Sequence, residues 1–125
     1  MEPLRIDMTD DSPRVIFDPA GKQFELSGKS LPENETKFYA PILKWLNAYK
    51  EKPAASTEFN IKLIYFNTAS SKMILDILLI LEEMVEEGHE VLVRWHAYVT
   101  DEDMQEAGRE YEEMVHVPFE HLVYD

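Results

Sequence analysis

The sequence contains no cysteine, which rules out a disulfide framework and a thiolate zinc site. It has only 12 lysines and arginines against 25 aspartates and glutamates, and the net charge of -13 argues against binding to nucleic acids or anionic membranes. No apolar stretch approaches the roughly 20 residues of a membrane span, and the N-terminus lacks the pattern of a secretory signal. We therefore expect a cytoplasmic protein whose partner is another protein or a small ligand.

Motifs of the main enzyme and metal classes are missing as well. The sequence has no glycine-rich phosphate loop, no GxSxG nucleophile elbow and no HExxH pair. Its histidines stand at spacings that suggest no common metal-binding face; they are His89, His96, His116 and His121. The sequence therefore predicts a protein that is not an enzyme and has no metal site and no cofactor.

A calcium-binding loop and a receiver domain are each excluded by the residues at specific positions. Asp101 and Asp103 resemble the start of a calcium-binding loop, but Glu106 stands where that loop requires a glycine. Helix capping and the helix dipole explain these acids without calcium. A receiver domain would carry its phosphorylated aspartate at the end of the central strand, where this sequence has Asn67 and Thr68.

The length and the 45% hydrophobic content fit one compact core. We predict a flexible arm or a weak first strand over residues 1–12 and a single domain over residues 13–125. Short β-type runs at residues 15–17 and 23–26 are separated by an Asp-Pro-Ala-Gly turn, which predicts a hairpin.

A first helix is predicted by apolar residues at helical spacing between residues 38 and 49. Ser30 and Glu33 before it have the spacing of a capping box. Pro41 removes one hydrogen bond, so we expect either a kink there or a helix that begins near Tyr39.

Two more helices follow the same spacing rule. One is predicted over residues 69–87, with Gly88 at the position where helices commonly end. The other begins near Thr100 and Asp103, which have capping-box-like spacing. The apolar arc of the helix at 69–87 is wide, so this helix packs on two sides or offers part of its surface to a partner.

The remaining apolar runs predict strands. Residues 59–66 alternate, but the second half is apolar on both faces, so we expect the end of this strand to be covered on both sides. Residues 91–98 and the C-terminal PFEHLVY segment give two more strands. The order of elements predicts an α/β fold with a mixed, mostly parallel sheet, an N-terminal β-hairpin and about three covering helices.

The segment YFNTASSK at residues 65–72 joins a strand to the helix at 69–87. Asn67 or Thr68 can cap this helix, and that role alone explains their presence. The end of a central strand before a helix is also where ligands and modifications tend to sit in α/β sheets. A phosphate on a hydroxyl here would add about 1.5 to 2 negative charges and change a docking surface, and Lys72 could offset part of that charge.

A second hypothesis concerns the same strand end. The crevice at the strand end near Thr68 could hold an anionic or nucleotide ligand, which would make the protein a small-molecule sensor.

Long segments of the chain resemble the SiaC family of bacterial regulatory phosphoproteins, which are similar to the STAS domains of anti-sigma-factor antagonists. The segments are SGKSLPENETKFYAPILKWL at 27–46, LIYFNTASSK at 63–72, ILLILEEMVEEGHEVLVRWH at 77–96, DEDMQEAGREYEE at 101–113 and PFE at 118–120. The PEN segment and the NT-x-SSK-like segment are specific when they occur together.

The resemblance implies a STAS-like fold and a partner switch. Thr68 matches the phosphorylated threonine of the family motif, with a dedicated protein kinase and a PP2C-like phosphatase acting on it. The unphosphorylated form is expected to bind and activate an output enzyme such as a diguanylate cyclase, in control of aggregation or biofilm formation through cyclic-di-GMP signalling. Ala69 stands where the family often has a serine, which leaves Thr68, Ser70 and Ser71 as the local hydroxyls.

We expect the surface around Thr68 to recognise the partner. Its polar part would be Asn67, Ser70, Ser71 and Lys72, and its apolar part Leu75 and Leu79. The PEN residues Pro32, Glu33 and Asn34 either contact a partner or fix the entry into the first helix, and the structural role is favoured.

Overall fold

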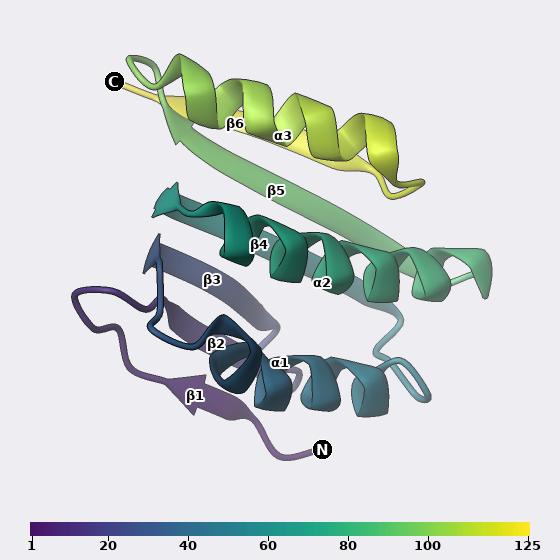
Figure 1. Ribbon diagram of the computed structural model, residues 1–125. Coiled ribbons are helices and arrows are strands. Elements are labelled where there is room, and N and C mark those ends of the chain that lie inside the picture. The colour runs from purple at the N-terminus through teal and green to yellow at the C-terminus, as the bar shows by residue number, and fades with distance from the viewer.

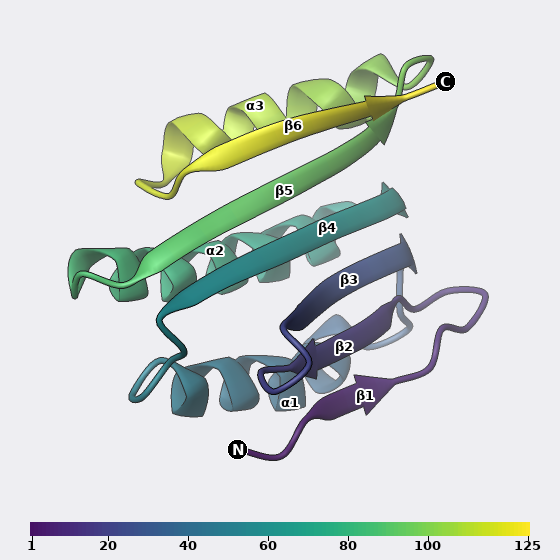
Figure 2. The same cartoon turned by 180° about the vertical axis from the view of Figure 1, so that it is seen from behind.

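The computed structural model describes residues 1–125 and consists of one six-stranded sheet with three helices packed on a single face (Figures 1 and 2). The strands are Leu4–Ile6 (β1), Arg14–Asp18 (β2), Gln23–Ser30 (β3), Ser56–Phe66 (β4), Glu90–Tyr98 (β5) and Phe119–Tyr124 (β6). The helices are Glu35–Tyr49 (α1), Thr68–Glu86 (α2) and Glu102–Met114 (α3).

The strands lie in the sheet in the same order as in the chain. Strands β1, β2 and β3 are antiparallel neighbours, whereas β3 to β6 are parallel and each consecutive pair is connected by a helix. Crossovers between parallel strands are right-handed, so strands added in one direction place all of their helices on the same face. This architecture confirms the predicted α/β fold with its mostly parallel sheet and N-terminal hairpin.

The core lies between the helices and the covered face of the sheet. It contains a cluster of 25 buried residues, including the predicted helix residues Ile42, Leu46, Ile74 and Leu78. The largest fully buried side chain is Trp95 of β5, whose indole N–H donates to the carbonyl of Met104 at 2.9 Å. The core therefore buries this ring without leaving its polar atom unpaired.

Residues 1–12 include the edge strand β1, which pairs with β2. The carbonyl of Glu2 accepts a hydrogen bond from the Trp45 indole at 2.9 Å, and the carbonyl of Asp11 accepts one from the Leu31 amide at 2.9 Å. Of the two alternatives for this segment, the structure has the short strand.

Two helices are capped by residues other than the predicted ones. The cap of α1 is Asn34, whose side chain accepts from the Lys37 amide at 3.0 Å, because Ser30 is the buried last residue of β3. The cap of α3 is Asp101 instead of Thr100. Helix α1 begins at Glu35 and continues past Pro41, so of the two alternatives predicted at this proline, a helix that begins near Tyr39 is wrong.

The end of β4 also differs from its prediction. The register with β3 shifts beside Gly28, where Gly28 pairs with Leu63 but the next residue pairs with Tyr65. This β-bulge reverses the alternation, so that Phe66 packs against Trp95 in the core while Tyr65 is 50% exposed. The expectation that this strand end is covered on both sides is wrong, because no helix packs on the other face (Figure 2).

The open face of the sheet is crossed by polar contacts between neighbouring strands. Arg94 of β5 donates hydrogen bonds to Glu58 of β4 and to Glu120 of β6. His96, also on β5, contacts Asn60 at 2.9 Å and the hydroxyl of Tyr124. These contacts tie the middle of the sheet to β6.

Burial lowers the pKa of His96 to about 4, because the imidazolium would lose hydration there. The cations of Lys62 and Arg94 lower this pKa further, whereas the carboxylates of Glu25 and Glu120 raise it. Neutral His96 can donate from one ring nitrogen to Asn60 Oδ1 and accept the Tyr124 O–H on the other.

Gly108 sets the distance between α3 and β5. A Cβ atom added to Gly108 would lie 2.5 Å from Cδ1 of Trp95. Although alanine favours helices by about 1 kcal/mol over glycine, we expect Gly108→Ala to lower the free energy of unfolding by about 1 to 3 kcal/mol through overpacking. Urea unfolding measures this change, with the exposed Glu110→Ala as control; an equally stable Gly108→Ala protein would contradict the packing argument.

His96 predicts a specific pH dependence of stability. The pKa of His96 is 6.5 in the unfolded chain and about 4 in the folded protein. As the pH drops through this range, the unfolded chain binds a proton before the folded protein does, so the free energy of unfolding decreases. Between neutral pH and pH near 4.5 the loss attributable to His96 should be about 2 to 3 kcal/mol. Urea unfolding of His96→Gln should show a flatter pH profile than wild type, and exposed His116→Gln should not; equal slopes for all three would refute the prediction.

Candidate functional site

The candidate site is built on Asn67, which connects β4 to α2. Its side chain accepts a hydrogen bond from the Ser70 amide at 2.8 Å, and its own amide donates to the Ser30 carbonyl at 3.1 Å. Its carbonyl accepts from the Ser71 amide at 3.0 Å. Asn67 therefore caps the helix and holds the helix start against the end of β3.

Thr68 is the first residue of α2, immediately after this cap, and it is exposed. The first turn of α2 contains no acidic residue that would occupy the positive end of the helix dipole. A hydroxyl at this position is open to an enzyme, and a negative charge placed on it would meet a favourable field.

Ser70 has a different environment. Its side chain is fully buried, and its hydroxyl accepts a hydrogen bond from Ser30 Oγ at 2.8 Å. Ser30 Oγ also lies 2.5 Å from the Tyr39 hydroxyl, and burial raises the pKa of Tyr39 while these hydrogen bonds oppose that change. This corrects the expectation that Ser70 belongs to the partner-binding surface. Its side chain is buried, and its hydrogen bond to Ser30 connects α2 with β3 and, through Tyr39, with α1.

Ser71 is half-buried and also engaged within the chain. Its hydroxyl donates to the Thr68 carbonyl at 2.6 Å, and its own carbonyl accepts from the Tyr111 hydroxyl of α3 at 2.7 Å. Burial raises the pKa of Tyr111, so this phenol stays protonated and keeps donating. Of the local hydroxyls, Thr68 is thus the one presented outwards.

A shallow groove of about 280 Å³ lies between α2 and α3, next to this turn. Lys72 is exposed at its rim and the half-buried Leu75 contributes to its apolar wall. Leu79, which is 40% exposed, lies one turn further along α2 and does not line the groove. The groove is lined by Phe66, Ser71, Lys72, Leu75, Ala107, Glu110, Tyr111 and Met114.

The PEN residues lie at the β3–α1 junction. Pro32 is buried and Asn34 caps α1, so both shape the entry into that helix, whereas Glu33 is exposed. Sequence reasoning missed the supporting roles of Ser30, Tyr39 and Tyr111. In two of these three contacts the bonded residues are 40 positions apart in the chain, so no local spacing could have revealed these roles.

The structure contains no cluster of three or more histidine, aspartate and glutamate side chains that could hold a metal ion. None of its helices is long and apolar enough to cross a membrane.

Comparison with known proteins identifies the family of the chain. The chain matches the SiaC family regulatory phosphoprotein description over residues 6–124. An uncharacterized protein of Pseudomonas aeruginosa is 30% identical over 125 residues, covering 100% of this chain and 99% of that protein.

Solved structures show the same likeness. SiaC of Pseudomonas aeruginosa is 27% identical with a TM-score of 0.89, covering 99% of this chain and 100% of that chain. A chain in the crystal structure of the diguanylate cyclase SiaD in complex with its activator SiaC, also from Pseudomonas aeruginosa, is 29% identical with a TM-score of 0.91. That match covers 97% of this chain and 99% of the other. The resemblance seen in the sequence is confirmed, and this protein belongs to the SiaC family of regulatory phosphoproteins.

Proposed function

We propose that this protein is a non-enzymatic partner switch controlled by a phosphate on Thr68. A dedicated kinase adds the phosphate, a PP2C-like phosphatase removes it, and the unphosphorylated form binds and activates a diguanylate cyclase. The observation that carries this proposal is the exposed Thr68 at the N-terminus of α2, beside Ser70 and Ser71, whose hydroxyls are engaged within the chain. The cytoplasm stays the predicted location of this circuit.

The fold can accept the phosphate at this place. The first turn of α2 has no acidic side chain, and unpaired N–H groups at a helix start attract anions. Lys72 lies one turn along the helix and is exposed, so its ammonium can offset part of the new charge. The modification should therefore leave the scaffold in place.

Partner binding, in contrast, should be sensitive to the phosphate. The proposed recognition surface comprises Asn67, Ser71, Lys72, Leu75 and Leu79, and its apolar part lies along α2. A phosphate carries about 1.5 to 2 negative charges, and it would have to be desolvated when a partner covers Thr68. An apolar or acidic partner surface would then be repelled.

The choice of partner rests on a relative. Solved SiaC is the activator in a complex with the diguanylate cyclase SiaD, and this chain has the same fold over 97% of its length. We extend that partner class, a diguanylate cyclase of the host organism, to the present protein.

The phosphorylation site can be identified by mass spectrometry. Wild-type protein, isolated from its own cells or incubated with its kinase and ATP, should gain a single phosphate on Thr68. Thr68→Ala should gain none, and Ser71→Ala should be labelled like wild type because its hydroxyl bonds to a backbone carbonyl. Unchanged labelling of Thr68→Ala would move the site elsewhere.

The effect on the partner can be measured with the host's diguanylate cyclase. Thr68→Ala should bind it and raise its cyclic-di-GMP synthesis as unphosphorylated wild type does, whereas protein carrying phosphothreonine at residue 68 should bind at least about tenfold more weakly. Leu79→Asp should also weaken binding, because it puts a charge on the proposed apolar contact.

A matched control is Val99→Asp, which changes a side chain that is 50% exposed and lies outside α2. It should bind like wild type. Equal affinity of the phosphorylated and unphosphorylated proteins would contradict the switch.

A further inference from the structure

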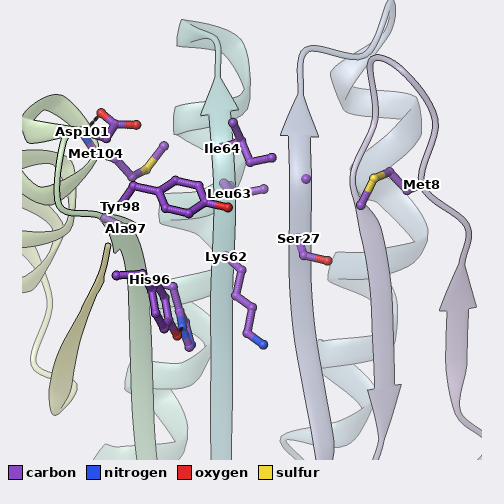
Figure 3. A pocket seen from close by; sticks show the side chains of 12 residues that line it. Met8, Ser27, Lys62, Leu63, Ile64, His96, Ala97, Tyr98, Asp101 and Met104 are labelled. Carbon is purple, nitrogen blue, oxygen red and sulfur yellow. Dashed lines mark hydrogen bonds between the residues drawn. The ribbon is translucent and has the colours of Figure 1, made fainter.

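The open face of the sheet contains a cleft that the proposed switch does not use (Figure 3). It has a volume of about 590 Å³, within the range of about 300 to 1,000 Å³ that is typical of small-molecule sites. Its walls come from β3, β4, β5 and the start of α3, together with Met8 and Tyr124. Thr68 is not among its lining residues.

The cleft exists because β4 and β5 separate near their carboxyl ends. Pairing between them stops at Ile61 and Trp95, although β4 continues to Phe66 and β5 to Tyr98. The bulge between β3 and β4 bends β4 at this place, and bulges are common beside binding sites. In Figure 3 the Tyr98 ring projects from β5 across the gap towards β4.

The walls of the cleft are mostly apolar. Leu63, Ala97 and Met104 are buried at its base, while Met8 and Ile64 are 51% and 53% exposed at its rim. Met8 and Ile64 therefore offer apolar surface to the non-polar part of a ligand in the cleft.

Most polar groups in the cleft already have partners. Both ring nitrogens of His96 are bonded, the Tyr124 hydroxyl contacts His96, and the Ser27 hydroxyl donates to Glu25. Asp101 accepts a hydrogen bond as the cap of α3. These groups hold the walls of the cleft in place.

Two hydrogen-bond donors are left for a ligand. The ammonium of Lys62 forms an ion pair with the Glu25 carboxylate at 3.6 Å, which is too long for a hydrogen bond, so its N–H groups stay available to a second acceptor on a side chain that is 44% exposed. The other is the hydroxyl of Tyr98, which is 53% exposed. A ligand that suits both would bring an acceptor, and a carboxylate is the acceptor that pairs best with an ammonium.

We propose that this cleft binds a small amphipathic carboxylate, with its apolar part between Met8, Ile64 and Tyr98 and its carboxylate on Lys62. The lining side chains lie in front of the sheet with the helices behind it (Figure 3), and Thr68 is not among them, so we expect binding here to be independent of Thr68 phosphorylation.

Octanoate and its alcohol, 1-octanol, are suitable probes, observed by methyl NMR of the full chain. Octanoate should produce saturable shifts below about 10 mM at Met8, Leu63, Ile64, Ala97 and Met104, as expected for a ligand of this size. The methyl groups of Leu79, on the helix side, should not move. Absence of saturable shifts, or equal shifts at Leu79, would overturn the proposal.

Two variants test the chemistry of the site. Lys62→Met should weaken octanoate binding about tenfold or more and remove the preference for octanoate over 1-octanol, because a hydrogen bond to a charged group is lost. Lys44→Met, an exposed lysine on α1, is the matched control and should bind like wild type. Unchanged octanoate affinity in Lys62→Met would refute the role of Lys62.

Discussion

The hydrogen bonds of Asn67 hold the site together. A single residue caps α2, joins the end of β4 to the end of β3, and leaves the next side chain at the surface. Helix starts need an acceptor for their unpaired N–H groups, and asparagine supplies one from its side chain. Because Asn67 meets this need, the hydroxyl of Thr68 is not required for the fold.

The neighbouring hydroxyls show how the same residue type takes different roles. Ser70 lies in the core within hydrogen-bond distance of Ser30, and Ser30 reaches Tyr39. Ser71 bonds to its own helix. The contacts of Ser70 and Ser30 hold α2 against α1 and β3.

The periodicity of the sequence was enough to predict the helices, the hairpin and the parallel order of the sheet. It failed where a distant contact decided the outcome. Sequence spacing predicts Ser30 as a helix cap and Ser70 as a surface residue. In the structure both are buried, and Ser30 donates a hydrogen bond to Ser70. The bulge opposite Gly28 could not be seen either, because an alternating pattern does not record a register shift between two strands.

The helices cover one face of the sheet and leave the other face open, as Figures 1 and 2 show. The helix side carries the proposed phosphorylation site and groove, whereas the open side carries ion pairs, His96 and the apolar cleft. Both sites depend on the end of β4, which lines the cleft with Leu63 and Ile64 and then leads into Asn67. One strand end thus supports two surfaces that face opposite ways.

The decisive comparison is an amide NMR spectrum of unmodified protein against protein that carries phosphothreonine at residue 68. A phosphate accommodated at the helix start should shift amides in the first turn of α2 and along the groove, leave the sheet unchanged, and alter the free energy of unfolding by about 1 kcal/mol or less. Shifts spread through the core, or a protein that no longer folds, would show that the hydroxyl of Thr68 is part of the scaffold instead of a free surface group.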